Sequence, residues 1–363
     1  MASRAEVPEA AARQPAVRGA RAVPGIVDVA AQAGVSTATV SRALRGVDRV
    51  SPATRDRVLA AAALLNYVAS PTAASLASGR TGVVAVLAPF LSRWFFAKVL
   101  DGVESRLRDE GLHVLLFNVG TTRSSRSLLL DRRLLRRRVD AVLAVSCDLE
   151  PPEVALVAAL NVPVVTVGVD AGGWDLVGID DVRAGHDAMA HLLALGHRDV
   201  AYIGGDRVRD VHVATAVSRL EGAQKAAAEV GAPAPPEHVG DWTVVGGLAV
   251  GQELLGRPDR PTAVFAASDE MAIGVVLAAR RLGLRVPEDL SVIGVDDHEL
   301  AFTHELTTVR QPVDELGTSA AGLLVDHLRT PRPDEHRTVV TLPTELVLRG
   351  STAPPSSSAG AQR

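Results

Sequence analysis

Residues 26–44, IVDVAAQAGVSTATVSRAL, predict two short helices joined by a tight turn. Gly34 lies where such a turn needs the left-handed backbone conformation that glycine adopts most readily. Ser36 is placed to cap the second helix, because its hydroxyl can accept a hydrogen bond from a free backbone N–H. The first helix is expected to bury one face, made of Val29, Ala30 and Ala33.

A third helix is predicted to begin after Ser51-Pro52, since serine caps helices and proline favours their first position. It should run to about Asn66. The side chains expected on its buried face are Val58, Leu59, Ala62 and Leu65. Three short helices of this kind form a helix-turn-helix head, whose second helix enters the major groove of DNA.

The groove-facing positions of the second helix are Thr37, Ala38 and Arg42. Arg42 can donate two hydrogen bonds to guanine O6 and N7, whereas the other two suit a base edge or a thymine methyl group. Further DNA contacts, mainly to phosphates, are expected from Ser36, Thr39, Ser41, Arg49 and Thr54. Each hydroxyl among them has an alternative role as a helix cap or a solvated side chain.

Charge divides unevenly along the chain. Residues 1–80 contain ten arginines and five carboxylates, a net charge of +5, so the net −4 of the whole chain leaves −9 for residues 81–363. A basic head on an acidic body indicates that the head binds a polyanion and the body does not. A flexible, charged N-terminus fits the same numbers, and residues 1–23 are expected to be disordered because they lack periodicity.

Residues 81–349 alternate apolar runs with amphipathic helical patterns. The runs predicted as strands are 83–89, 113–119, 141–145, 162–169, 200–205, 263–268 and 291–297. Apolar strands separated by helices indicate an α/β body of two doubly wound parallel sheets with helices on both faces. Ligands bind such folds at the carboxyl ends of the strands. The positions that follow the predicted strands are 89–96, 146–148, 170, 206–219, 268–269 and 296–297.

Composition and motifs exclude several classes of protein. No run approaches ~18 apolar residues, so no membrane span is expected. The first residues lack the apolar segment of a secretory signal, and Cys147 is the only cysteine. A cytoplasmic protein without disulfides or a cysteine zinc cluster is therefore predicted. The chain has no P-loop and no G-x-S-x-G motif, so neither an enzyme nor a cofactor or metal site is expected.

Two strings in the head, DVAAQAGVSTATVSRAL (28–44) and RVSPATRDRVLAAAALLNY (49–67), resemble the DNA-binding head of the LacI/GalR family of transcriptional regulators. Segments that resemble the family's effector-binding body follow in the family's order: RLEGAQKAAAEVG (219–231), GDW (240–242), FAASDEMAIG (265–274), VPEDLSVIGVDD (286–297) and LTTVRQP (306–312). The resemblance implies a body similar to type I periplasmic binding proteins. It also implies a repressor that binds a pseudo-palindromic operator in double-stranded DNA as a homodimer or larger assembly.

The segment PTAASLASGRTG (71–82) resembles the family's hinge, which implies that Leu76 inserts into the minor groove as an apolar wedge. The family usually has Pro-Asn shortly after the tyrosine that matches Tyr67, whereas this chain has Ala69 and Ser70. A plain linker is the alternative, since Ala/Ser/Gly-rich strings are often flexible.

The resemblance also implies effector contacts, from Phe95, Phe96, Arg219, Trp242, Asp269 and Asp296. Carboxylates and a guanidinium can hydrogen-bond hydroxyls and aromatic faces can cover a sugar ring, so a carbohydrate is favoured over a purine. Each residue has an alternative role: one phenylalanine in the core, Asp269 as a helix cap, Trp242 as a loop anchor. Val244–Val245 replace the acidic or serine residue common in the family, which leaves the ligand's identity open.

The expected domains follow from these segments. They are a disordered tail at 1–23, a helix-turn-helix domain at 24–69, a hinge at 70–81, an effector-binding and dimerisation domain at 82–349 and a disordered tail at 350–363. One subdomain should combine about 82–179 with 309–341, and the other about 180–308 with 342–349. A solute-binding protein of a transporter and an enzyme are the alternative functions.

Overall fold

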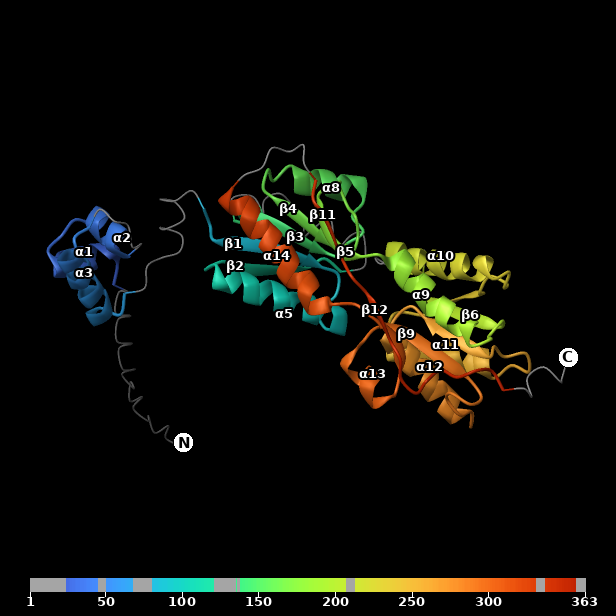
Figure 1. Ribbon diagram of the computed structural model, residues 1–363. Coiled ribbons are helices and arrows are strands. Elements are labelled where there is room, and N and C mark those ends of the chain that lie inside the picture. Colours follow the sequence, from blue (N-terminus) through green and yellow to red (C-terminus); the bar gives the residue numbers. More distant parts are fainter. Residues whose placement is uncertain are drawn as a thin grey trace, which may run out of the picture. The chain divides into compact units, whose positions relative to one another are not determined.

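The computed structural model describes residues 24–44, 50–67, 80–120, 135, 138–206, 213–330 and 337–356 (Figure 1). The chain divides into two compact units between residues 79 and 80, here called the head and the body. The predictions for residues 1–23, for Arg49 and for most of the hinge, including Leu76, lie outside the described residues.

The head contains three helices: α1 Ile26–Ala33, α2 Thr37–Leu44 and α3 Pro52–Leu64. Gly34 has φ 67° and ψ 38°, so the left-handed turn after α1 is confirmed. Val29, Val40 and Val58 are completely buried between the helices. The prediction that Leu59 is buried is wrong: it is 47% exposed, because it lies one helical step away from the buried row that begins at Val58.

The body contains two six-stranded sheets, each with helices on both faces, so the predicted fold class is confirmed. The first sheet has the order β11-β5-β4-β3-β1-β2, with β1 Val83–Ala88, β2 His113–Asn118, β3 Ala141–Val145, β4 Val164–Val167, β5 Asp175–Ile179 and β11 Val339–Leu342. The second has the order β12-β10-β9-β8-β6-β7, with β6 Val200–Gly204, β7 Glu237–Val239, β8 Ala263–Ala266, β9 Ser291–Asp296, β10 Thr307–Arg310 and β12 Glu345–Val347. Strand β12 pairs antiparallel with β10, whereas the other pairs are parallel.

Alternate residues of the central strands pack against opposite helix layers, as expected for parallel strands buried on both faces. In the first sheet, Val84 and Val86 face α5 Trp94–Asp109 and α14 Val313–Arg329, whereas Ala85 and Leu87 face the layer of α8 Pro151–Ala158. The second sheet packs against the helices α9 Asp181–Ala194, α10 Val213–Glu229, α11 Val244–Leu255 and α12 Asp269–Arg281, and β9 leads into the short helix α13 Glu299–Thr303. In Figure 1, α9 and α10 lie on one side of this sheet and α11 and α12 on the other.

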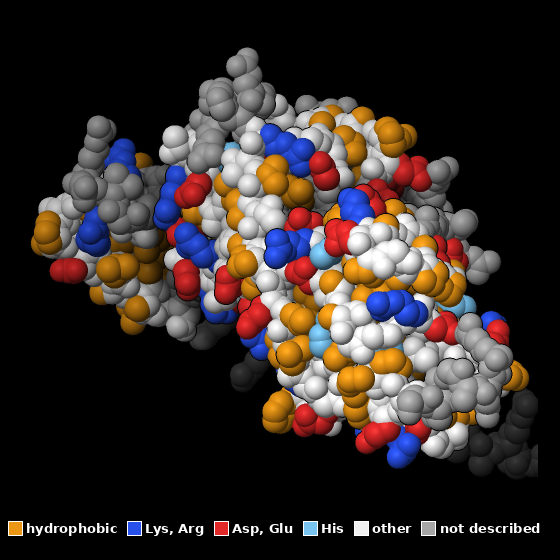
Figure 2. All heavy atoms as spheres, turned by 45° about the vertical axis from the view of Figure 1, so that its right-hand side comes forward, with side chains coloured by type: hydrophobic (Ala, Val, Ile, Leu, Met, Phe, Trp, Pro, Cys, Tyr) orange, Lys and Arg blue, Asp and Glu red, His pale blue; other side chains and the backbone are white. Residues whose placement is uncertain are grey.

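Each sheet with its helices forms one lobe of the body. The chain passes between the lobes after β5, after β10 and after β11. No described helix is long and apolar enough to cross a membrane. Figure 2 shows acidic and basic side chains interspersed over one face of the molecule rather than gathered by sign.

The chain stays ordered beyond residue 349, where a disordered tail was predicted. Ser351 is 1% exposed, donates a hydrogen bond to the Val292 carbonyl (2.6 Å) and accepts one from the Thr307 amide (2.8 Å). These bonds attach the segment after residue 349 to β9 and β10. The polar composition of the segment did not predict this attachment. Residues 357–363 lie outside the described part.

Candidate functional site

A cavity of about 630 Å³, including its open mouth, lies between the two lobes of the body. The first lobe contributes Arg93, Phe95, Phe96, Ser146 and Gly168 to its wall. The second lobe contributes Asp181, Arg219, Trp242, Ser268, Glu270 and Asp296. Gln311, in the segment that connects the lobes after β10, closes one side.

Arg219 is the central cation of this wall. It lies on α10 and is only 3% exposed. Its Nε donates to Asp181 Oδ1 (2.8 Å), and its Nη1 donates to the Ala267 carbonyl (2.5 Å) and lies 3.8 Å from Asp296 Oδ1. Close packing of α9 on α10 makes this possible, because a Cβ at Gly222 would lie 1.9 Å from a backbone oxygen of α9. Two carboxylates and a backbone carbonyl thus hold the guanidinium in place at the cavity wall.

Asp296 ends β9 and reaches the cavity through an unusual backbone conformation. Its φ is 129°, a value that side-chain-bearing residues rarely adopt. Its Oδ1 accepts a hydrogen bond from Gln311 Nε2 (2.5 Å). Burial raises the pKa of Asp296 to about 6, although Arg219 and Gln311 act in the opposite direction.

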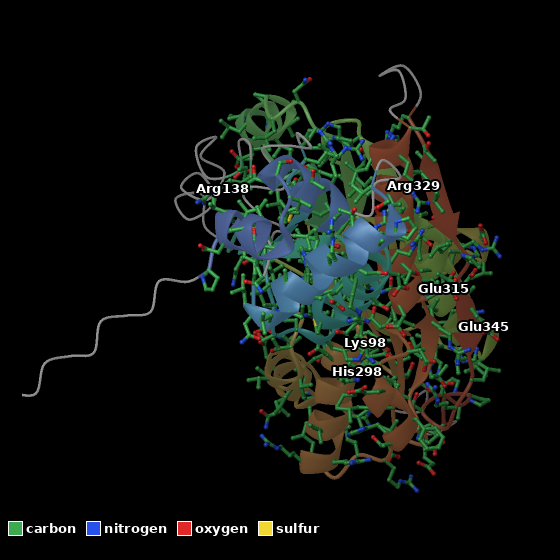
Figure 3. The ribbon with its side chains drawn as sticks, turned by 90° about the vertical axis from the view of Figure 1, so that its left-hand side faces the viewer. Lys98, Arg138, His298, Glu315, Arg329 and Glu345 are labelled. Atoms are coloured by element: carbon green, nitrogen blue, oxygen red, sulfur yellow. The ribbon has the colours of Figure 1, made fainter. Side chains whose placement is uncertain are left out.

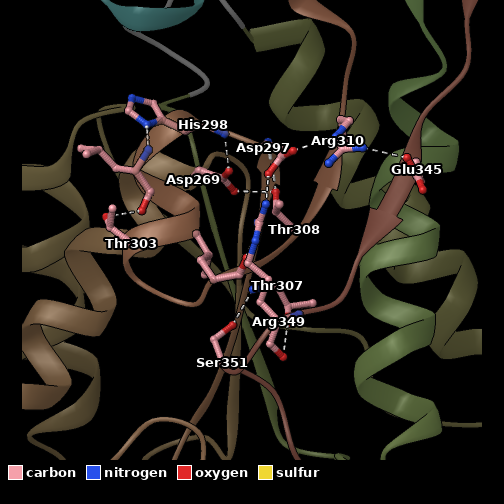
Figure 4. Close-up of polar contacts among 12 residues, drawn as sticks. Asp269, Asp297, His298, Thr303, Thr307, Thr308, Arg310, Glu345, Arg349 and Ser351 are labelled. Carbon is pink, nitrogen blue, oxygen red and sulfur yellow. Dashed lines mark hydrogen bonds and ion pairs between the residues drawn. The ribbon is translucent and has the colours of Figure 1, made fainter.

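Asp269 does not line the cavity, although the sequence placed it among the effector contacts. It is completely buried behind the wall: Oδ2 accepts a hydrogen bond from the His298 amide (2.8 Å) and Oδ1 one from the Thr308 hydroxyl (2.7 Å) (Figure 4). These bonds hold the turn after β9 in place. The helix cap at this point is Ser268, which accepts from the Met271 amide (3.4 Å), so the capping role proposed for Asp269 is also wrong.

The predicted aromatic residues border the cavity from both lobes. Phe96 is 3% exposed and packs edge-on against Phe90 (centroids 5.8 Å apart), so it belongs to the core, whereas Phe95 is only partly buried. Trp242 is 9% exposed and has φ 61°. The cavity therefore has flat apolar faces on opposite sides.

Sequence reasoning missed two carboxylates of the wall, Asp181 and Glu270. Asp181 follows Asp180, the residue that caps α9 by accepting from the Arg183 amide (2.9 Å). Glu270 lies in the first turn of α12, and burial, followed by the charge of Asp296, raises its pKa to about 7. Burial also raises the pKa of Asp181, despite its ion pair with Arg219. Among the described residues no cluster of His, Cys, Asp and Glu could hold a metal ion.

The lobes also touch directly near the cavity. The rings of Trp94, on α5, and His298, before α13, have centroids 4.7 Å apart. Lys98, one turn further along α5, reaches Glu299 with an Nζ–Oε2 distance of 4.0 Å. Figure 3 shows Lys98 and His298 close together at this contact.

A polar network next to the cavity joins the connecting segments. Asp297 follows Asp296 and forms ion pairs with Arg310 (2.7 Å) and Arg349 (2.5 Å) (Figure 4). Arg310 also pairs with Glu345 (3.0 Å) on β12. Asp297 therefore joins the end of β10, just before the chain leaves the second lobe, to Arg349, just after the chain has returned to it.

In the head, α2 presents its predicted DNA-contacting side chains to solvent. Thr37, Ala38 and Arg42 are exposed, whereas Val40 and Ala43 are buried. Three of the other predicted contacts take part in helix caps: Ser36 accepts from the Thr39 amide (3.2 Å), and Ser51 accepts from that of Thr54 (3.3 Å). The hydroxyls of Thr39 and Thr54 also hydrogen-bond their capping serines (both 2.9 Å). Ser41 is partly buried.

Both the head and the body are similar to known proteins. Residues 25–70 match the family model of bacterial regulatory proteins of the lacI family, and residues 189–352 match a periplasmic binding protein-like domain. The chain is 32% identical to catabolite control protein A of Priestia megaterium, over 90% of this chain and 98% of the relative.

Solved structures align over both units as well. A Lac repressor dimer bound to operator and the anti-inducer ONPF aligns with a TM-score of 0.82 at 28% identity, over 91% of this chain and 99% of that one. A complex of the transcriptional regulator CelR with cellobiose aligns with a TM-score of 0.66 at 33% identity, over 90% and 99%.

A helix-turn-helix head on a two-lobed, periplasmic-binding-protein-like body defines a bacterial DNA-binding regulator with an effector-binding core. The chain belongs to the lacI family of bacterial regulatory proteins.

Proposed function

We propose that this protein is a sequence-specific transcriptional repressor whose affinity for its operator is set by a carbohydrate or carbohydrate derivative bound in the cavity. The supporting observation is the buried Arg219, held by Asp181 and Asp296 and faced by Phe95 and Trp242. Such a wall supplies hydrogen-bond donors, acceptors and apolar faces together, as binding of a polyol requires. The similar structure with cellobiose supports the same ligand class. The function proposed is binding rather than catalysis.

On DNA, we assign base contacts to Thr37, Ala38 and Arg42 of α2. The remaining contacts, mainly to phosphates, are assigned to Ser36, Thr39, Ser41, Arg49 and Thr54. Leu76 is assigned to the minor groove, where an apolar wedge can kink the duplex. Two copies of the chain would bind adjacent half-sites, so the operator should be pseudo-palindromic.

Effector control follows from the position of the cavity between lobes. A ligand that touches both lobes favours one angle between them over another. The body continues into the hinge, so a change of angle alters how two hinges and heads meet the operator. The effector contacts that this proposal retains are Phe95, Arg219, Trp242 and Asp296, joined by Asp181, Ser268 and Glu270. Phe96 also borders the cavity but is assigned to the core, where it supports Phe95.

The decisive experiment is selection of bound duplexes from a randomised DNA pool by the full-length protein near physiological salt. Enrichment of a two-fold symmetric site is expected, and the enriched site then allows sugars to be screened for an effect on binding. No enrichment, with or without a mixture of sugars and nucleosides, would contradict the proposal and favour a solute-binding protein. Removal of residues 1–80 should abolish operator binding and leave effector affinity largely intact.

A further inference from the structure

The wall of the cavity contains more carboxylates than guanidiniums. Three carboxylates (Asp181, Glu270 and Asp296) and two guanidiniums (Arg93 and Arg219) form part of its wall. Arg219 lies between Asp181 and Asp296, with N–O distances of 2.8 and 3.8 Å. One cation thus serves two carboxylates, and this half of the cavity keeps a surplus of carboxylates over guanidiniums.

Glu270 adds to that surplus. It lies in the first turn of α12, where the helix dipole stabilises a carboxylate, and its side chain is partly buried at the cavity. Within the described ranges, no hydrogen bond or ion pair joins its carboxylate to another residue. Arg93 is the other cation of the cavity wall, and its guanidinium lies 3.7 Å over the ring of Phe90, in the first lobe. The charge of Arg93 lowers the pKa of Glu270, but burial and the charge of Asp296 outweigh it.

The apolar part of the wall also suits a cation. Trp242 borders the cavity in the same lobe as Glu270, and Phe95 borders it from the other lobe. Aromatic faces attract cations, and the attraction grows when water is removed. An anionic ligand, by contrast, would meet three carboxylates, and Arg219 already donates to Asp181 and to the Ala267 carbonyl.

We propose that the effector carries a protonated amine beside its hydroxyls, and that Glu270 recognises the amine. This inference rests on the proposed function, because it refines the carbohydrate class to amino sugars or amino polyols. Arg219, Asp181 and Asp296 bind hydroxyls, while the Glu270 carboxylate, which no hydrogen bond joins to another described residue, binds the ammonium group. Sugar phosphates and uronates are disfavoured for the same reason.

The proposal has a pH signature. Burial and the charge of Asp296 raise the pKa of Glu270 to about 7, so this carboxylate gains its charge between about pH 6 and 8. An amine with a pKa above 8 stays protonated over that range. Its affinity should therefore rise several-fold from pH 6 to pH 8, whereas that of a neutral sugar should not.

Matched ligands and variants test the proposal with the full chain. Hexoses that carry an amine, a hydroxyl or a carboxylate at C6, in the gluco and galacto series, are titrated by calorimetry at pH 7.5. The expected result is at least tenfold tighter binding of one amine than of its hydroxyl counterpart, with no tighter binding of the uronate. Glu270→Gln should reduce this preference to less than threefold. Glu253→Gln, at an exposed carboxylate of α11, is the matched control and should preserve it.

Three other results of these titrations are possible, and each would overturn a different part of the proposal. Tighter binding of the hydroxyl or carboxylate member would overturn the amine inference and leave the carbohydrate effector standing. An amine preference that survives Glu270→Gln would remove Glu270 from the assignment. Binding of no sugar up to about 10 mM would overturn both the amine inference and the carbohydrate class, while selection of an operator would still test the DNA-binding role separately.

Discussion

Replacement of Asp296 by asparagine is expected to stabilise the body at neutral pH while weakening effector binding. Asp296 is 7% exposed, and burial raises its pKa from the ordinary 3.8 to about 6. A carboxyl group with a raised pKa contributes stability at low pH that is lost as the pH rises through the folded-state value. Asparagine keeps the oxygen that accepts from Gln311 but never ionises.

The magnitude follows from the difference between the two pKa values. That difference is about 2, and at about 1.4 kcal/mol per pKa unit it gives about 3 kcal/mol of destabilisation once the carboxylate is fully ionised, above about pH 7. At pH 5 most of the folded protein holds the proton, so the cost falls to about 1.5 kcal/mol. Asp296→Asn should therefore be more stable than the wild type by an amount that roughly doubles from pH 5 to pH 7.5.

Urea unfolding followed by tryptophan fluorescence measures this difference. All three tryptophans (Trp94, Trp174 and Trp242) lie in the body, so the signal reports that unit. Asp101→Asn, at an exposed aspartate of α5, is the control and should show no such change with pH. An Asp296→Asn protein that is no more stable than the wild type at pH 7.5, or a gap that does not narrow at pH 5, would refute the reasoning.

Three further predictions concern the head, the helix packing and the lobe connection. Arg42→Ala should cost about 1–3 kcal/mol of operator binding and relax base preference at one position per half-site; an equal loss on all sequences in an anisotropy assay would indicate a phosphate contact instead. Gly222→Ala should destabilise the body by roughly 1–3 kcal/mol, because the new methyl group would lie 1.9 Å from a backbone oxygen of α9. Gly322→Ala, whose nearest neighbour is 3.9 Å away, should leave Tm unchanged or slightly higher. Arg310→Ala removes two ion pairs of a half-exposed arginine, worth about 1 kcal/mol or less, so Tm should hardly move while the effector's influence on DNA affinity shrinks. An unchanged influence would show that the contact is only structural.

The sequence predicted the strands that contain a long apolar run and missed the shorter or more polar strands β5, β7, β10, β11 and β12. Strand β10 contains Thr307 and Thr308, both completely buried, because their hydroxyls find partners in Arg349 and Asp269. The hydrophobic pattern of the sequence cannot predict which distant residues will hydrogen-bond these hydroxyls. Strands β11 and β12 are only partly buried. A partly exposed strand does not need the continuous apolar run of a central strand, so these two strands gave no clear signal in the sequence.

The same limit applies to the cavity. The rule that ligands bind after the strands indicated the segments that hold Phe95, Ser146, Arg219 and Asp296. It could not separate Asp296 from Asp269, because both are acidic residues that follow apolar strands. Only the fold shows that Asp269 uses both carboxylate oxygens on the protein's own donors, whereas Asp296 faces the cavity.

The cavity lies at the points where the lobes are joined, so a ligand in it would contact the segments that connect one lobe to the other. Asp181 begins α9 just after the crossing that follows β5, and Gln311 lies in the crossing that follows β10. Asp296 is adjacent to Asp297, which pairs with Arg310 and with Arg349 beyond the crossing that follows β11. Packed cores resist gradual deformation, so a ligand is expected to act on these joints rather than through either sheet. Under the proposed function, the lobes should then turn as rigid bodies about these connecting segments.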